Sequence, residues 1–331
     1  MTSVAFAIAH PNIALAKYWG KVAAPTNLPA VPSLSMTLDA MSTRTSVGFG
    51  PGLDSDRVVI NGRSATVAEA RRVTALLDRV RAEAGIRTRA WVETANDFPT
   101  GSGLASSASG FAALALAATK AAGLEWEPAK VSDLARQASA SAARSIFGGF
   151  VTLARSEPDT EFLAAEPLAG SIDWPVAISV VITTFQPKEV GSTEGMTHTR
   201  ATSPYYDAWV ARAPEVFERA RSAVVARDLD ALGKAAEESA FAMHACAMAA
   251  SPPLVYISPV TLAVVERVRG LSRAGIAAYV TMDAGPQVKV LSSAADAPRI
   301  ASVLRDLPGV EKVVVARPGP GASVELVRKG T

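Results

Sequence analysis

A stretch rich in glycine and serine, set between a predicted strand and an alanine-rich run, constrains the fold of this chain most. Residues 96–109 read NDFPTGSGLASSAS, between a strand-like segment at 89–94 and a helical pattern at 103–122. Glycine lets the backbone turn tightly and approach a ligand, and the free N–H groups and dipole of a helix N-terminus bind phosphate. The spacing is neither the Walker pattern nor the dinucleotide fingerprint. A phosphate cradle and a serine-capped turn before a core helix are both open interpretations.

The rest of the chain mixes short strands with amphipathic helices and ends in a split β-α-β order. From residue 259 the pattern is helix, strand, strand, helix, strand, which is typical of a ferredoxin-like unit. We therefore expect an α+β chain of two lobes, residues 1–185 and 186–331, with a loosely held tail after Gly319. The expected strands are 4–9, 33–39, 43–50, 148–153, 176–183, 276–282, 287–291 and 310–316, and the expected helices include 67–85, 259–273 and 297–307.

Composition excludes several classes of function. Of 331 residues, 49% are hydrophobic and 19% are charged, so a large core is expected, and the net charge of +2 with no basic stripe argues against nucleic acid as a partner. Cys246 is the only cysteine and the three histidines are scattered, so neither an internal disulfide nor a zinc site is expected. The first residues lack a basic leader, and the apolar run at 176–185 is shorter than the roughly 20 residues of a membrane helix. We expect a cytoplasmic protein with no membrane partner.

Two further clusters combine positive charge with hydroxyl groups. Residues 10–21, HPNIALAKYWGK, bring Lys17, Tyr18 and Lys21 close together after a strand, either as ligands or as an exposed pair of lysines on an amphipathic segment. Residues 139–150, SASAARSIFGGF, place Arg144 after two serines. Arginine is the better planar clamp for a carboxylate or phosphate, although most single arginines lie on the surface.

A fourth cluster places Asp283 in a tight turn between two apolar strands, in the run TMDAGPQVKVL. The alternative for Asp283 is a hydrogen bond within its own turn. Lys188 and Ser192 form another polar candidate, with Ser192 as plausible as a helix cap. His244 is expected to be a satisfied buried histidine. Because no nucleophile–base pair or metal cage emerges, the clusters together indicate an anionic, phosphate-rich substrate.

These segments together resemble the diphosphomevalonate decarboxylase family of the GHMP kinase superfamily. The runs PNIALAKYWGK, NDFPTGSGLASSASGFAALA, ARSIFGGF, STEGM, AMHACAMAASPP and YVTMDAGPQVKVL follow the family's order between Ala9 and Leu291. The resemblance implies a GHMP-kinase-like fold, with an N-terminal lobe like ribosomal protein S5, a C-terminal ferredoxin-like lobe, and the active site between them. It also implies ATP and Mg²⁺ and, by family precedent, a homodimer.

The implied reaction belongs to the mevalonate pathway of isoprenoid biosynthesis. ATP phosphorylates the C3 hydroxyl of mevalonate 5-diphosphate, and loss of phosphate and CO₂ then gives isopentenyl diphosphate. Residue by residue, Asp283, Lys17 and Arg144 match the family's catalytic aspartate, its companion lysine and the arginine on the substrate carboxylate. The substrate-binding set matches Tyr18, Lys21, Ser139, Ala140, Ser141 and Ser192. The ATP phosphate loop matches Pro99, Gly101, Ser102, Gly103, Leu104, Ala105, Ser106 and Ser107, with Lys188 as a further candidate; no metal-ligating residue is assigned.

The chain departs from the family pattern at Ala140, where glycine is usual between the two serines. The added methyl group could crowd a backbone contact to the diphosphate, so a decarboxylase of mevalonate 5-phosphate is one alternative. A kinase of the same fold that phosphorylates C3 and stops is another. A non-catalytic relative that only binds nucleotide is disfavoured, because the polar site residues are intact.

Overall fold

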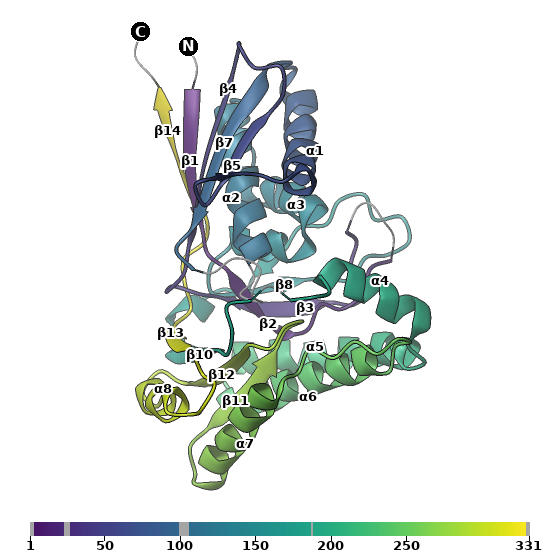
Figure 1. The fold of residues 1–331 in the computed structure, drawn as a ribbon, viewed down its shortest axis with the longest axis vertical. Helices are drawn as coiled ribbons and strands as arrows, with labels where there is room; N and C mark the ends of the chain where they lie inside the picture. Colours follow the sequence, from purple (N-terminus) through teal and green to yellow (C-terminus); the bar gives the residue numbers. More distant parts are fainter. Residues whose placement is uncertain (1–2, 23–26, 99–105, 187, 329–331) are drawn as a thin grey trace.

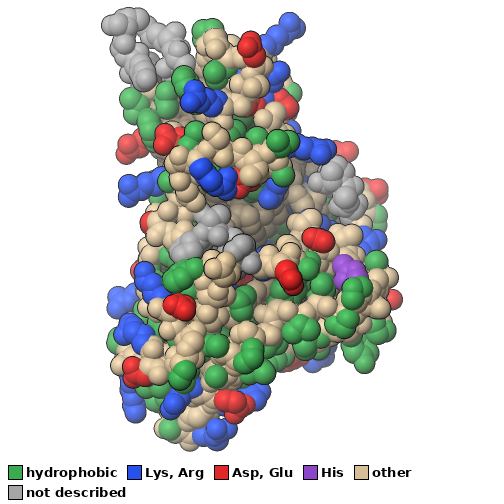
Figure 2. All heavy atoms as spheres, in the orientation of Figure 1, with side chains coloured by type: hydrophobic (Ala, Val, Ile, Leu, Met, Phe, Trp, Pro, Cys, Tyr) green, Lys and Arg blue, Asp and Glu red, His purple; other side chains and the backbone are tan. Residues whose placement is uncertain are grey.

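The chain forms two lobes stacked along the long axis of the molecule (Figure 1). This computed structural model describes residues 3–22, 27–98, 106–186 and 188–328. The two ends of the described chain lie side by side on the first lobe, because the last strand pairs with the first. Basic and acidic side chains are interspersed over the face shown in Figure 2.

The first lobe is built on a six-stranded sheet with the order β14-β1-β4-β7-β5-β6, and all its pairs are antiparallel except β5–β7. Helices α1 and α2 pack against it, and the helix α3 packs on α2. The bounds are β1 Ser3–Ala9, β4 Thr43–Gly50, β5 Arg57–Ile60, β6 Arg63–Ser64, β7 Arg89–Asn96, β14 Ser323–Arg328, α1 Val67–Ala84, α2 Ser106–Ala121 and α3 Pro128–Ala138.

Local chemistry sets the ends of the helices that the sequence predicted. Helix α1 begins at a capping box, in which Thr66 and Glu69 satisfy each other's backbone N–H groups, and it ends at Gly85 with φ 66°. Helix α7 (Pro259–Arg273) begins after a Ser258 cap with proline in its first turn, as expected. Helix α2 begins at Ser106, so Ser106 and Ser107 occupy its first turn, also as expected.

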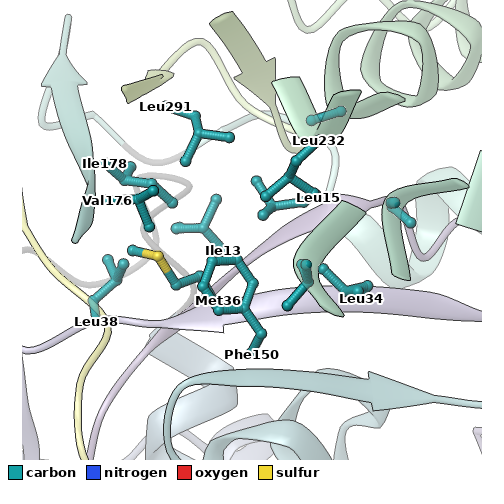
Figure 3. Close-up of a cluster of buried hydrophobic side chains, with 14 of the residues drawn as sticks. Ile13, Leu15, Leu34, Met36, Leu38, Phe150, Val176, Ile178, Leu232 and Leu291 are labelled. Atoms are coloured by element: carbon teal, nitrogen blue, oxygen red, sulfur yellow. The ribbon is translucent and has the colours of Figure 1, made fainter. Parts of the chain in front are cut away.

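A second sheet, with the order β2-β3-β8-β9, lies between the lobes. Every residue of β2 (Asn12–Ala16), β3 (Ser33–Thr37) and β8 (Phe150–Leu153) is buried; β9 is Glu166–Pro167. Their apolar side chains point toward those of the second lobe and form one continuous core (Figure 3). The labelled members are Ile13, Leu15, Leu34, Met36, Leu38, Phe150, Val176, Ile178, Leu232 and Leu291. The shared core fixes the lobes against each other, so a site between them has rigid walls.

The second lobe carries an antiparallel sheet with the order β11-β12-β10-β13. Helices α5 and α6 pack on each other, and α6, α7 and α8 pack against this sheet. None of the helices in the described ranges is long and apolar enough to cross a membrane. The bounds are β10 Val176–Ile182, β11 Ala278–Met282, β12 Val288–Ser293, β13 Lys312–Ala316, α4 Ser192–Thr202, α5 Tyr206–Ala226, α6 Leu229–Met248 and α8 Ala297–Arg305. Two short 3-10 helices, η1 Ala140–Ile146 and η2 Ser171–Asp173, precede β10 in the chain.

The chain crosses between the lobes at other places than the expected boundary. Strand β10 pairs with β12 and β13, so a division after residue 185 separates it from its own sheet. Strand β14 pairs with β1 and returns the chain to the first lobe. We expected the tail after Gly319 to be loosely held, and this is wrong as far as residue 328. Six residues, Ser323 to Arg328, pair with β1. We propose that the first crossing lies between β9 and β10.

Candidate active site

A cavity of about 550 Å³ lies between the lobes, and all the predicted site residues in the described ranges line it. Its walls come from β2 and the segment after it, β7, α1, α2, the 3-10 helix η1, the start of α4 and the turn between β11 and β12. The described members of the predicted set that line it are Lys17, Tyr18, Lys21, Ser106, Ser107, Ser139, Ala140, Ser141, Arg144, Lys188, Ser192 and Asp283.

Asp283 follows β11, and its two carboxylate oxygens face two ammonium groups. Lys17 Nζ lies 2.8 Å from Oδ1, and Lys289 Nζ lies 3.1 Å from Oδ2. The Asp283 side chain is 28% exposed and opens into the cavity. Burial alone would raise its pKa, but the two lysines outweigh burial and hold the pKa well below its ordinary range. Asp283 is therefore ionised at any physiological pH.

Lys17 stands directly after β2, where the chain leaves the sheet between the lobes. Its Nζ donates to the carbonyl of Ala14 at 2.7 Å, and its backbone N–H donates to Ser239 Oγ of α6 at 2.8 Å. These bonds fix the ammonium group beside Asp283. Lys17 is 2% exposed, and burial lowers its pKa to about 8 although Asp283 opposes that shift. The exposed alternative considered for this lysine is wrong.

Arg144 lies in η1 with only 1% exposure, and neutral groups hold it. Its Nε donates to Ser35 Oγ at 2.9 Å, and its Nη1 donates to Ser33 Oγ at 2.6 Å. Among the described residues no carboxylate forms an ion pair with it. Burial lowers the pKa of Arg144 to about 10, so the guanidinium keeps its charge at neutral pH. A buried cation without a carboxylate beside it is prepared to receive an anion.

The serines before Arg144 surround Ala140, the position at which the sequence departs from the pattern that it resembles. Ser139 is the C-terminal cap of α3, and its Oγ lies 3.3 Å from Ser141 Oγ. Ala140 lies between them, 3% exposed, on the cavity wall. Asn12 on β2 also holds this segment, because its side-chain Nδ2 donates to the Ser141 carbonyl at 2.9 Å.

Tyr18 and Lys21 follow Lys17 on the same segment. The Tyr18 hydroxyl is buried without a hydrogen-bond partner in the described part of the chain, and burial raises its pKa. Lys21 Nζ donates to Asn27 Oδ1 at 2.6 Å and to Thr193 Oγ1 at 3.3 Å, across the cavity mouth to α4. Burial lowers the pKa of Lys21 as well. An orphaned hydroxyl and a nearby ammonium are suitable donors for phosphate oxygens.

Lys188 precedes α4 and Ser192 begins it, near the turn that carries Asp283. Lys188 Nζ donates to Ser192 Oγ at 2.7 Å and to the carbonyl of Ala284 at 2.9 Å. Burial lowers the pKa of Lys188 to about 8. The N-terminal cap of α4 is Gly191 rather than Ser192, so the capping role considered for Ser192 is wrong.

The proposed phosphate loop is only partly within the described residues. Ser106 and Ser107 begin α2 and line the cavity, as a phosphate site at a helix N-terminus requires. Pro99, Gly101, Ser102, Gly103, Leu104 and Ala105 lie outside the described residues, so their assignment stays a prediction.

Sequence reasoning missed three groups of residues, one on the cavity wall and two that contact site residues without lining the cavity. One is an apolar pocket beside α2, in which the Arg72 guanidinium lies 4.6 Å from the centre of the Phe111 ring. The others are the serines of β3 that hold Arg144, and Lys289. The β3 serines and Lys289 each had a signal in the sequence, namely a hydroxyl or a charge at an inward position of an otherwise apolar strand. The apolar pocket is lined by Ile60, Val73, Val92, Phe111 and Leu114.

His244 is buried as predicted, and the Met282 backbone interacts with its ring. Both ring nitrogens lack a hydrogen-bond partner of normal geometry within the described residues. Burial lowers the pKa of His244 to about 4, so the imidazole is neutral.

The oxygen atoms on the cavity wall suit a magnesium ion that binds mainly through the phosphates of the substrates. Among the described residues no group of three His, Cys, Asp or Glu side chains is placed to hold a metal ion. Magnesium usually keeps several waters and binds through substrate phosphates with one or two protein oxygens. The hydroxyls of Ser106 and Ser107 and the carboxylate of Asp283 are among the protein oxygens of that kind on the cavity wall.

Comparison with known proteins identifies the family to which the chain belongs. A family model described as the diphosphomevalonate decarboxylase-like N-terminal domain matches residues 9–164, and one described as the mevalonate 5-diphosphate decarboxylase C-terminal domain matches residues 178–317. A diphosphomevalonate decarboxylase of Candida albicans is 30% identical over 88% of this chain and 85% of its own length. The chain belongs to the diphosphomevalonate decarboxylase family.

Two further relatives bear on fold and substrate. A solved structure described as a complex with MVAPP, AMPPCP and magnesium is 37% identical, with a TM-score of 0.92 over 98% of this chain and 99% of the other. The expected GHMP-kinase-like fold of two lobes is thereby confirmed. A phosphomevalonate decarboxylase of Haloferax volcanii is 32% identical over 96% of both chains.

Proposed function

We propose that this chain uses the cavity between its lobes to decarboxylate mevalonate 5-diphosphate with ATP and Mg²⁺. The C3 hydroxyl of the substrate takes the terminal phosphoryl group of ATP. The C3–O bond then breaks, the carboxylate leaves as CO₂, and isopentenyl diphosphate, ADP and phosphate are released. The observation that carries the proposal is the placement of Asp283, with Lys17, and of Arg144 on the wall of one cavity that also receives the N-terminus of α2.

Asp283 orients the hydroxyl and accepts its proton late. A tertiary alcohol is too weak an acid for a carboxylate of ordinary pKa, about 3.9, to deprotonate before reaction. In the loose transition state of phosphoryl transfer the nucleophile needs orientation first, and the proton leaves as the new bond forms. Lys17 keeps Asp283 ionised and aimed, since its Nζ holds Oδ1 at 2.8 Å.

Arg144 holds the substrate carboxylate during the second step. Breaking the C3–O bond leaves positive character on C3. The electron pair that joins C2 to the carboxylate carbon then moves toward C3, forms the C2–C3 double bond and releases CO₂. A contact that stabilised the carboxylate fully would raise the barrier to its loss. The serines that hold Arg144 are neutral and fix its position without neutralising its charge.

The remaining residues bind the two phosphorylated ends. Tyr18, Lys21, Ser139, Ser141 and Ser192 face the cavity where the substrate diphosphate would lie. Ser106 and Ser107 at the start of α2, with Lys188, would bind the phosphates of ATP. Magnesium, when bound, neutralises charge on those phosphates. The apolar pocket with Arg72 and Phe111 suits the adenine base.

Mevalonate 5-phosphate is the second candidate substrate. The methyl group of Ala140 on the cavity wall favours it, and the relative from Haloferax volcanii is a phosphomevalonate decarboxylase.

The test is to follow ADP and CO₂ release with Mg²⁺-ATP and, separately, mevalonate, its 5-phosphate and its 5-diphosphate. Equal amounts of ADP and CO₂ with the diphosphate alone are expected. A preference for the monophosphate would make the second candidate the substrate, and ADP without CO₂ would make the chain a kinase.

The family precedent also supports a homodimer in the cytoplasm. Light scattering of the purified chain should give twice the mass of 34.3 kDa, and a fluorescent fusion should distribute through the cytoplasm. A mass of one chain would contradict the dimer.

A further inference from the structure

Lys289 is a charged residue in the interior of the second sheet. It lies at the second position of β12, opposite Thr281 on β11 and Val180 on β10, with 0% exposure. The sheet face it shares with Leu291 packs into the apolar core between the lobes. A buried ammonium group is costly unless it is paired, so a lysine at this position needs a specific role.

Its partner is the Asp283 carboxylate. Lys289 Nζ lies 3.1 Å from Oδ2, while Lys17 Nζ lies 2.8 Å from Oδ1. The two lysines come from different sheets, Lys17 from the segment directly after β2 and Lys289 from β12. Each carboxylate oxygen therefore has its own ammonium partner, and the two contacts together fix the plane of the carboxylate.

We propose that Lys289 is a positioning residue that sets the orientation and the charge of Asp283 for the transfer of the phosphoryl group. This inference rests on the proposed function, in which Asp283 receives the C3 hydroxyl. With both lysines in place, the pair of cations exceeds the charge of the single carboxylate. The catalytic centre is then cationic, and it attracts the transferring phosphate although an aspartate lies within it.

Lys289 also sets how Asp283 responds to acid. An opposite charge in contact lowers the pKa of a carboxyl group by about 1–3 units, so removal of Lys289 should raise the pKa of Asp283 toward its ordinary range, although Lys17 still lowers it. The other charged or titratable groups that act on Asp283 stay in place, and they are Lys17, Lys188, Arg144 and His244.

The experiment compares K289M, which keeps the length of the side chain but not its charge, with K289R, which keeps the charge. K312M is the matched control, because Lys312 is an exposed lysine of the same sheet, on β13. The values of kcat and KM are measured between about pH 4 and 9, and each is divided by the wild-type value, which cancels the ionisation of the substrates.

We expect K289M to lose about 10- to 100-fold in kcat near neutral pH, because its carboxylate is less well aimed. The loss should deepen as pH falls, with an acid limb that the wild type does not show, and the KM for ATP should stay within about twofold. K289R should recover most of kcat and abolish the acid limb, and K312M should match the wild type. A K289M variant that folds and shows a ratio near one, or a loss that does not vary with pH, would overturn the proposal.

Stability gives a second, independent measurement. If K289M does not fold, the double variant D283N/K289M tests the pairing, because it removes both charges of the ion pair at once. Recovery of folding in the double variant supports the pairing of Lys289 with Asp283, and an equally unfolded double variant overturns it. This cycle needs no turnover, so it separates a failure of the Lys289 role from a failure of the wild type to decarboxylate mevalonate 5-diphosphate.

Discussion

The two opposite charges at the centre of the site, Asp283 and Arg144, are held in different ways. Asp283 has an ammonium group on each oxygen, whereas Arg144 is held by two serine hydroxyls and has no ion-pair partner among the described residues. The charge of Asp283 is more than balanced by the protein. The charge of Arg144 is left for the substrate.

The difference follows from what each group must do. Asp283 must stay anionic and correctly aimed while a proton approaches it, so surrounding cations are an advantage. Arg144 must bind a carboxylate that is later lost, so a protein carboxylate beside it would compete with the substrate. A site built on this contrast predicts different consequences when each charge is removed.

The largest effect is expected at Asp283. The D283N variant should lose at least about a thousandfold in kcat, because the amide cannot accept the proton of the hydroxyl. It should also be less stable by about 3–5 kcal/mol, because removing one partner of a buried pair leaves charge uncompensated. Assays of ADP and CO₂ release, with nucleotide binding by calorimetry, measure both effects. Nucleotide binding should be nearly unchanged; wild-type turnover in this variant would contradict the role of Asp283.

Removing the charge of Arg144 should cost activity but less stability. The R144M variant should lose about 100- to 1,000-fold in kcat/KM, since an ionic contact with the carboxylate disappears. Its melting temperature should fall less than that of D283N, because no buried anion is left behind. Differential scanning calorimetry of the two variants side by side checks this. A larger stability loss in R144M would break the contrast.

The serines around Arg144 should act through its position. The S35A variant should raise the KM for the substrate about tenfold, because a hydrogen bond to a charged group is worth about 1.5–3 kcal/mol and only part of it is felt in binding. The KM for ATP should not change. S179A is the control, since Ser179 is also a buried serine on a strand but its hydroxyl has no partner among the described residues. Equal effects of the two substitutions would indicate a general loss of packing.

Loss of the positive charge beside Asp283 should produce an alkaline limb in the pH profile of kcat/KM. Burial lowers the pKa of Lys17 to about 8, so the charge is present below that pH and is lost as pH rises through it. We expect kcat/KM to fall by half near pH 8 and kcat to fall at higher pH, because the bound anions stabilise the ammonium form. Lys188 has a similar pKa of about 8. The limb should persist in K188M; its disappearance there would assign it to Lys188.

The smallest effect is expected at Ala140, outside the two charged centres. The A140G variant should improve kcat/KM for the diphosphate by about two- to fivefold relative to the monophosphate, since it removes one methyl group from the cavity wall. Competition between the two substrates in one assay measures this ratio directly. An unchanged ratio would mean that Ala140 is tolerated and does not set the preference.

The sequence predicted elements and residues whose signals are local. Proline and serine at the start of α7, the glycine after α1 and the serines at the start of α2 each determine structure within a few residues of themselves. Motifs located Lys17, Arg144 and Asp283, and the fold brings them to one cavity. Their roles stay predictions.

What the sequence did not predict depends on pairing between distant segments. Nothing near Ser323–Arg328 indicates that it pairs with β1, and the place of β10 depends on strands that follow it by more than a hundred residues. The holding of Arg144 by β3 and the placement of Lys289 beneath Asp283 likewise arise only when sheets are assembled. Their one local signal was a polar residue at an inward position of a buried strand.

The most direct test of the contrast uses a substrate analogue in which a methyl group replaces the carboxylate. Calorimetry measures its affinity and that of mevalonate 5-diphosphate for the wild type, D283N and R144M. The wild type and D283N should bind the true substrate at least about tenfold more tightly than the analogue, because a charge-assisted contact is worth about 1.5–3 kcal/mol, and R144M should bind the two equally. Undiminished discrimination in R144M would contradict the claim that the free charge of Arg144 is kept for the substrate carboxylate.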